Sequence, residues 1–182
     1  MVMDNFPEFD PENEEMEVEV IEHPQPTTDR SAARRIALQI LYELDSTKHP
    51  IGQVLDAHVQ SRPILTSKII RYARNLVFGV DEHRILLDEL IQKYAPERPL
   101  MDLAIIDRNI LRLALYEIFA RPHLSFNIII HEAVTLASLF GSESSPRFIN
   151  GVLGTIAEDM DQLRERYSHL ANSEQSDPDE VD

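Results

Sequence analysis

The stretch SSPRFINGVLGTIA, residues 144–157, decides between a helical and a β-rich fold. Asn150-Gly151 between apolar pairs is typical of a tight β-hairpin. Ser145-Pro146 favours a helix instead, because it offers a capping hydroxyl followed by proline at the first helical position. The apolar residues settle the choice, since they repeat at helical and not at alternating intervals: Phe148, Ile149, Val152, Leu153 and Ile156. The stretch is therefore predicted to be helical.

Gly151 and Gly154 are unusual within a helix, because each costs about 1 kcal/mol of helix stability relative to alanine. Their spacing of three residues places them near one another on the helix surface. The cost is offset if another helix approaches the backbone closely at this point. We therefore expect a close helix–helix contact at these two glycines, with the Asn150 amide tied to a neighbouring backbone.

The rest of the chain carries the same helical period. Gly79 offers a break between two of the predicted helices, and Gly141 suits a helix C-terminal cap. No segment shows the alternation of a strand. Helices are predicted at 29–46, 51–60, 65–79, 81–94, 100–120, 126–140 and from 145 to about 168. We expect an all-α domain over 29–170, with about seven helices joined by short loops and packed as antiparallel bundles.

Composition excludes several classes of protein. The chain has no cysteine, so it has neither a disulfide framework, nor a thiolate zinc site, nor a cysteine nucleophile. The N-terminus lacks the basic and apolar regions of a secretory signal, and no window approaches the roughly 18 apolar residues that span a bilayer. A cytoplasmic protein is expected.

The net charge of −15 is confined to the two ends of the chain. Residues 1–29 hold ten acids and residues 171–182 hold five, and neither segment contains Lys or Arg. The remaining 17 acids balance the 17 bases of the middle. The ends, 1–28 and 171–182, are predicted to be disordered acidic tails. Two roles stay open for them: solubility, or competition with RNA for a basic face.

Four segments in one order and spacing resemble the transcription antitermination factor NusB family: ARRIALQILYELD (33–45), ILRLALYEI (110–118), HEAVTLASLFG (131–141) and RFINGVLGTIA (147–157). The resemblance covers about residues 30–160. It implies two three-helix subdomains with an extra helix. It also implies that the chain binds the boxA element of ribosomal RNA leader transcripts, together with the ribosomal protein NusE. RNA polymerase and other Nus factors join that complex, premature termination is suppressed, and neither catalysis nor a cofactor or metal is involved.

RNA binding needs cations for phosphates and flat side chains for unstacked bases. The helix predicted at 29–46 supplies both, with three arginines and with Arg35, Gln39 and Tyr42 on one face. A solvated charged face with a half-buried Tyr42 is the alternative, and the resemblance favours RNA. The predicted RNA-binding residues are Arg30, Arg34, Arg35, Gln39, Tyr42, Arg147 and Phe148.

The resemblance places the NusE contact on acidic residues of the helix bearing ILRLALYEI and just before it. The matching positions are Asp102, Asp107, Tyr116 and Glu117. Ordinary surface charge is the alternative, with Glu117 pairing with Arg121 one helical turn on. Opposite charges steer association, so acidic residues suit a basic ribosomal protein.

This chain departs from the resemblance in its N-terminal bases. Thr27, Thr28 and Asp29 precede Arg30, where relatives carry a run of Lys and Arg, so weaker boxA binding without the partner is expected. NusB-like domains also precede RNA methyltransferases, but a methyltransferase needs a catalytic thiol and a Gly-rich nucleotide loop, and both are missing. The remaining alternative is a helical protein-interaction scaffold, or a homodimer, without RNA binding.

Overall fold

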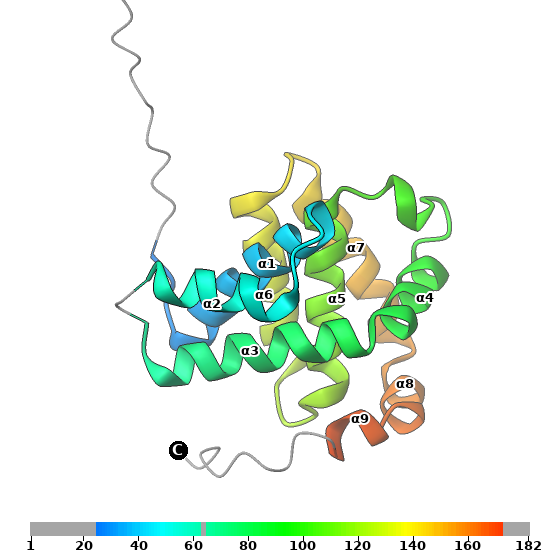
Figure 1. Ribbon diagram of the computed structural model, residues 1–182. Helices are drawn as coiled ribbons and strands as arrows, with labels where there is room; N and C mark the ends of the chain where they lie inside the picture. The colour runs from blue at the N-terminus through cyan, green and yellow to red at the C-terminus, as the bar shows by residue number, and fades with distance from the viewer. Residues whose placement is uncertain (1–24, 63–64, 173–182) are drawn as a thin grey trace, which may run out of the picture.

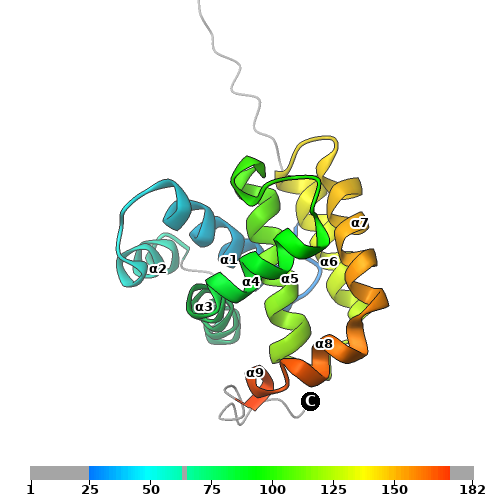
Figure 2. The same ribbon diagram turned by 90° about the vertical axis from the view of Figure 1, so that its right-hand side faces the viewer.

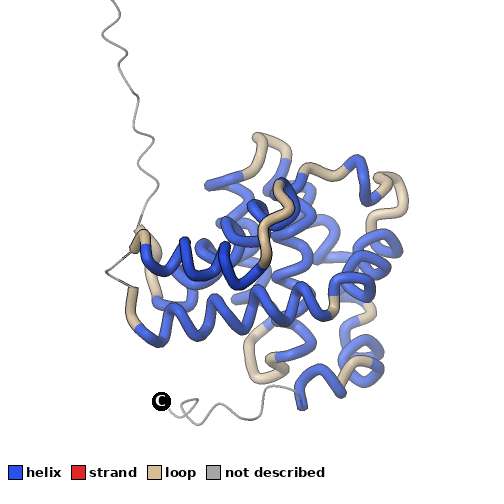
Figure 3. The backbone as a smooth tube through the Cα atoms, in the orientation of Figure 1, coloured by secondary structure: helices blue, strands red, loops and turns tan. Residues whose placement is uncertain are grey.

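The computed structural model describes residues 25–62 and 65–172, and this part of the chain is helical without a strand (Figure 3). The all-α prediction is confirmed. The acidic tails fall outside this range except for 25–28 and 171–172. The helices are α1 (Asp29–Ser46), α2 (Ile51–Gln60), α3 (Ser67–Glu82), α4 (Arg84–Tyr94), the short 3₁₀ turn η1 (Leu100–Asp102), α5 (Ile105–Ala120), α6 (Phe126–Phe140), α7 (Ser145–Glu158), α8 (Met160–Arg166) and α9 (His169–Asn172).

The helix α1 begins where its local sequence predicts a helix start. The Thr28 hydroxyl oxygen accepts a hydrogen bond from the Ser31 backbone N–H at 3.0 Å, as expected of an N-cap threonine. The inward face carries Ala33, Ala37 and Leu41, which are fully buried. These residues pack α1 against α3 and α5 (Figure 1).

The helix α5 forms the centre of the molecule. Every residue from Asn109 to Ala120 is buried, so this helix is enclosed on all sides. Helices α1, α2 and α3 lie on one side of it, while α6 and α7 lie on the other with α4 alongside (Figure 2). The short helices α8 and α9 close one end of α5. This arrangement agrees with two three-helix groups that share a core.

Two long predicted helices are interrupted. The segment 100–120 contains η1, and an extended backbone at Leu103 and Ala104 precedes α5. The apolar pattern continues through this break because Leu103 is itself buried. The final predicted helix divides at Asp159 and Tyr167 into α7, α8 and α9. Periodicity does not reveal such breaks, because each piece keeps a buried apolar face.

Gly79 is the glycine that permits a close helix contact. It does not end α3, which continues to Glu82. A Cβ at this position would overlap the buried ring of Tyr116 on α5. The Tyr116 ring also stacks on His83, with 5.9 Å between the ring centroids. The missing side chain of Gly79 therefore lets α3 and α5 pack through this ring.

The predicted close contact at Gly151 and Gly154 is wrong. Both residues are exposed on α7, and a Cβ at either would have no heavy atom within 4 Å among the surrounding residues that the structure describes. Asn150 is exposed as well. Gly141 follows α6 as predicted, but its φ of −91° is not left-handed. Its role is steric, because a Cβ there would clash with Ser145 at the start of α7.

These differences predict opposite effects of one substitution at two glycines. Gly79→Ala should lower the free energy of unfolding by more than about 1 kcal/mol, because the new methyl group displaces the Tyr116 ring. Gly154→Ala is the matched control and should raise it by up to about 1 kcal/mol, since alanine favours the helix. Urea denaturation followed by circular dichroism measures both. Equal changes at the two positions would contradict this account of the packing.

Candidate nucleic-acid interface

The outer face of α1 presents most of the residues that the sequence predicts there. Arg30 is exposed, Tyr42 is 45% exposed, and Arg35 and Gln39 are half-buried. The Arg30 guanidinium also lies 5.8 Å from the ring centroid of Tyr72 on α3. A cation, an amide and an accessible ring therefore share one surface, as RNA binding requires.

Arg34 does not lie on this surface. Its residue is only 3% exposed, and the surface position that the sequence analysis expects is wrong. The guanidinium donates two hydrogen bonds to Glu117 on α5, from Nε at 2.8 Å and from Nη2 at 2.9 Å. Arg34 shares its face of α1 with Ala37 and Leu41, three and seven residues further on, and both are fully buried, so it points into the core. A direct contact between Arg34 and RNA does not fit this geometry.

Two further helices join the Arg34–Glu117 pair. Glu132 on α6 lies 3.4 Å from Arg34 Nη1 and accepts a hydrogen bond from the Ser31 hydroxyl at 2.8 Å. The Tyr72 hydroxyl on α3 donates to Glu117. Burial alone lowers the pKa of Arg34, but the charge and hydrogen bonds of Glu117 outweigh it and raise that pKa. Arg34 therefore keeps its positive charge in the interior.

The start of α7 forms a second surface, which contains Arg147 and Phe148. Arg147 is exposed, and the half-buried ring of Phe148 lies below the Arg98 guanidinium at 4.8 Å from the ring centroid. A groove of about 570 Å³ opens here between the segment after α4 and the outer face of α7. Its lining residues are Tyr94, Ala95, Pro96, Glu97, Arg98, Ser144, Arg147, Phe148, Gly151, Val152 and Thr155.

Arg98 and Tyr94 are groove residues that the sequence analysis missed. The Tyr94 hydroxyl donates to Asp159 at 2.7 Å, which fixes one wall of the groove. Arg98 lies in a connection between helices, in the segment APERP, where no periodic pattern signals a site. Only the packing of α4 beside α7 brings it to Phe148. Gly151 takes part in the same groove, which explains why its missing side chain meets open space.

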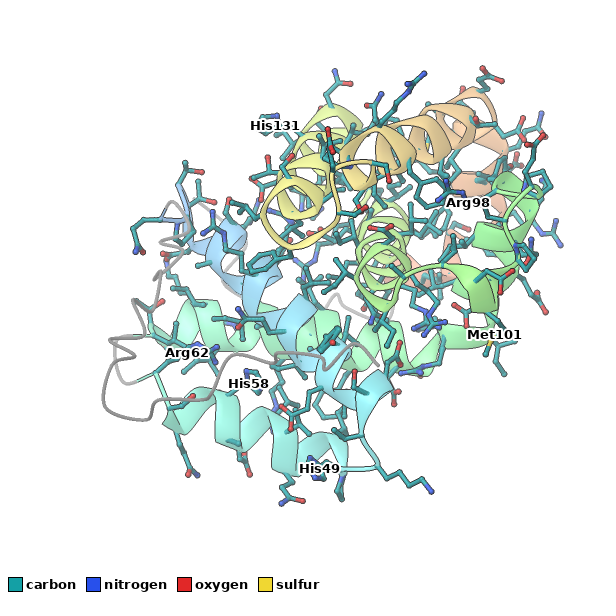
Figure 4. The ribbon with its side chains drawn as sticks, turned by 90° about the horizontal axis from the view of Figure 1, so that it is seen from above. His49, His58, Arg62, Arg98, Met101 and His131 are labelled. Carbon is teal, nitrogen blue, oxygen red and sulfur yellow. The ribbon has the colours of Figure 1, made fainter. Side chains whose placement is uncertain are left out.

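The two surfaces lie on opposite sides of α5. Figure 4 shows Arg98 beside α7, whereas Arg62 lies on the side of α1 and α2.

The residues predicted to contact a protein partner are mostly interior. Asp102 is exposed on η1, next to Met101, which is 83% exposed. Asp107, Tyr116 and Glu117 are buried, with exposed fractions of 6%, 3% and 1%. Their predicted place on a contact surface is therefore wrong. Glu117 pairs with Arg34, and Tyr116 fills the space beside Gly79.

A second group of buried charges fixes the other end of α1. The Asp45 carboxylate accepts hydrogen bonds from Arg84 at 2.7 Å and from Arg112 at 2.8 Å. Arg112 also donates twice to Asp88, at 2.6 and 2.8 Å. Burial alone raises the pKa of Asp45, but the charges of Arg112 and Arg84 reverse this and lower it. Helices α1, α4 and α5 meet at this group.

Two absences hold for the part of the chain that the structure describes. No cluster of three or more His, Asp or Glu side chains there could hold a metal ion. In the same residues, no helix combines the length and the apolar character needed to cross a bilayer.

A family model described as "NusB family" matches residues 31–158. This chain belongs to the NusB family. Among curated relatives, the transcription antitermination protein NusB of Roseiflexus castenholzii is 43% identical over 139 residues, which cover 75% of this chain and 95% of the relative. The protein of the same name from Chloroflexus aggregans is 42% identical over 129 residues, which cover 70% and 85% of the two chains.

Solved structures of NusB proteins share the fold. The T. maritima NusB structure is 27% identical, with a TM-score of 0.65, and the match covers 78% of this chain and 94% of that one. A complex of the antitermination factors NusB and NusE with double-stranded RNA matches with a TM-score of 0.64 at 24% identity, covering 76% and 98%. The helical packing described above is therefore that of the NusB family.

The buried position of Arg34 predicts a loss of stability when its partner is removed. Glu117→Leu alone should lower the free energy of unfolding by about 3–5 kcal/mol, because Arg34 keeps its charge without its main partner. The double substitution Arg34→Met with Glu117→Leu should recover much of this loss, since no uncompensated charge remains. Urea denaturation of Glu117→Leu, Arg34→Met and the double variant measures the coupling.

Asp81→Asn is the matched control for this experiment. Its partner Arg84 lies 3.5 Å away and the Asp81 side chain is 48% exposed, so the cost should stay below about 1 kcal/mol. A Glu117→Leu variant as stable as this control would show that the buried pair does not hold the core together.

Proposed function

We propose that this chain is an antitermination factor that binds the boxA element of ribosomal RNA leader transcripts together with NusE. In this role it prevents premature termination, and RNA polymerase and other Nus factors are reached through the RNA–NusE complex. The role is one of binding and not of catalysis. Membership of the NusB family and the two surfaces on α1 and α7 support the proposal.

The groove at the start of α7 is the observation that carries the proposal. Phe148 offers a ring face 4.8 Å from a guanidinium, and Arg147 adds a second cation at the beginning of the same helix. Single-stranded RNA is held by rings on which its unstacked bases lie and by cations along its backbone. A groove of about 570 Å³ has room for one nucleotide.

The α1 surface would hold a second part of the same strand. Tyr42 supplies an accessible ring, while Arg30 and Arg35 supply charge and Gln39 an amide for base edges or ribose. Arg34 does not contact RNA in this proposal. It contributes indirectly, because its buried pair with Glu117 holds α1 in place against α5. With few exposed cations, the salt dependence of binding should be shallow.

The proposed NusE contact is centred on Asp102. This carboxylate and the highly exposed Met101 stand together on η1, which combines a charge with an apolar contact. The Asp102 carboxylate would attract a basic ribosomal protein, and the bound protein would cover Met101. Three residues would not touch the partner, because they are buried in the interior beneath this surface: Asp107, Tyr116 and Glu117.

The RNA proposal predicts losses of affinity at two rings. Phe148→Ala and Tyr42→Ala should each weaken boxA binding by roughly 5- to 100-fold, since a stacked base contributes about 1–3 kcal/mol. The measurement titrates labelled boxA RNA with the protein, with and without NusE, at two salt concentrations. Phe78→Ala is the control, because Phe78 is 41% exposed on α3 and belongs to neither surface.

Three outcomes would contradict the RNA proposal. One is equal affinity of Phe148→Ala and Phe78→Ala. Another is equal binding of an unrelated RNA by the unchanged protein. The third is no binding with or without NusE, in which case a helical interaction scaffold or homodimer becomes the better description.

The partner proposal predicts an effect of charge reversal on η1. Asp102→Lys should weaken association with NusE by about tenfold or more and slow its rate, because like charges then face each other. Binding of the two proteins in the absence of RNA, followed by surface plasmon resonance, measures both quantities. Asp161→Lys on α8 makes the same change of charge at another exposed position. Equal effects of the two variants would remove η1 from the interface.

A further inference from the structure

A line of polar contacts runs along the junction of α1 and α2 (Figure 4). Arg62, just after α2, donates from Nη2 to the Gln39 side-chain oxygen at 2.6 Å and from Nη1 to His58 Nδ1 at 2.9 Å. His58 Nε2 in turn contacts Glu43 at 2.9 Å, and His49 contacts the other oxygen of Glu43 at 3.2 Å. Neither the sequence pattern nor the family resemblance singles out Arg62 or His58.

The two partners of His58 dictate its protonation. A guanidinium can only donate, so Nδ1 must offer its lone pair to Arg62. The Glu43 carboxylate can only accept, so Nε2 must carry the proton. His58 is therefore neutral in this arrangement, with a fixed tautomer. Hydrogen bonds to His58 and His49 lower the pKa of Glu43, which keeps this carboxylate ionised as the fixed end of the line.

These hydrogen bonds hold the guanidinium of Arg62 beside the proposed RNA surface on α1. Gln39 lies between Arg35 and Tyr42 on the outer face of α1, and it is the residue to which Arg62 binds. Arg62 also donates to the His58 backbone oxygen at 3.1 Å, so the guanidinium is held at three points. A surface arginine normally loses conformational freedom when it binds a phosphate, and a guanidinium already fixed in place loses less.

We propose that Arg62 is an RNA-contacting residue of this chain, paired with Gln39 on the α1 surface, and that neutral His58 is the positioning residue that holds it there. The inference rests on the proposed function, because it concerns the same RNA and the same surface. It adds a cation from the segment just after α2 in a sequence that lacks the N-terminal bases of relatives. The ligand is the phosphate backbone of single-stranded RNA, with the Gln39 amide beside it.

Protonation of His58 would disrupt this arrangement. A proton on Nδ1 would point at the Arg62 donor 2.9 Å away and place two positive charges side by side. The groups that face His58 are Glu43 from α1, Arg62 beyond the end of α2, and His49 through Glu43. Positioning of Arg62 in this arrangement therefore requires the neutral form of His58.

The experiment is a double-mutant cycle with Arg62→Ala and His58→Ala. Labelled boxA RNA is titrated with each variant, with the double variant and with the unchanged chain, in the presence of NusE. Arg62→Ala should weaken binding about tenfold and reduce the slope of log K against log salt by about 1, as for one lost phosphate contact. His58→Ala should weaken it less, and should add nothing once Arg62 is absent.

The salt dependence separates positioning from simple structural support. His58→Ala should reduce the slope of log K against log salt in the chain that keeps Arg62, and should leave the slope of the Arg62→Ala chain unchanged. Arg166→Ala is the matched control, because it removes an exposed arginine on α8, away from α1 and α2 (Figure 1). Thermal unfolding of each variant shows whether the fold is kept.

The outcomes distinguish this inference from the proposed function. If the unchanged chain binds boxA and Arg62→Ala behaves like Arg166→Ala, the proposed function stands and the assignment of Arg62 fails. If Arg62→Ala weakens binding but His58→Ala is additive with it, or His58→Ala leaves the salt slope of the Arg62-containing chain unchanged, the positioning role of His58 fails. If the unchanged chain does not bind boxA, both proposals fail together.

Discussion

The buried pair between Arg34 and Glu117 is the interaction on which the arrangement of the helices depends. Two hydrogen bonds of 2.8 and 2.9 Å join α1 to α5 across a separation of 83 residues. Tyr72 and Glu132 bring α3 and α6 to the same point. A buried charge is costly unless its partners are well placed. Four helices must therefore take up one relative position before this guanidinium is satisfied.

The far end of α1 is fixed in the same way. Asp45 meets Arg84 and Arg112, which come from α4 and α5. With a buried ion pair near each end, α1 can neither slide along α5 nor rotate on it without separating charges. Its outer face is set as a consequence, and Gln39 and Tyr42 are directed outward together. The interior charges thus fix the surface that we propose for RNA.

The same interior pairs change how the charge of this protein should be interpreted. Arg34 and Arg112 are among its 17 bases, yet both are enclosed by carboxylates. The bases that solvent reaches are fewer than the composition suggests, in a chain of net charge −15. A dense cationic field is not the means by which such a surface would hold RNA. Individually positioned groups suit it better, such as Arg98 over Phe148 and Arg62 against Gln39.

The sequence by itself determined the helical class and the bounds of α1, α2 and α6, because caps and a 3.6-residue period are local properties. It also placed Tyr42, Arg147 and Asp102 at the surface. The tertiary structure alone decided which charged groups are interior, because Glu117, the partner that compensates the charge of Arg34, lies 83 residues away along the chain. It likewise decided that Gly79, and not Gly151, permits close packing. These outcomes depend on residues such as Glu117 and Tyr116, which are distant along the chain and meet α1 and α3 only in the folded core.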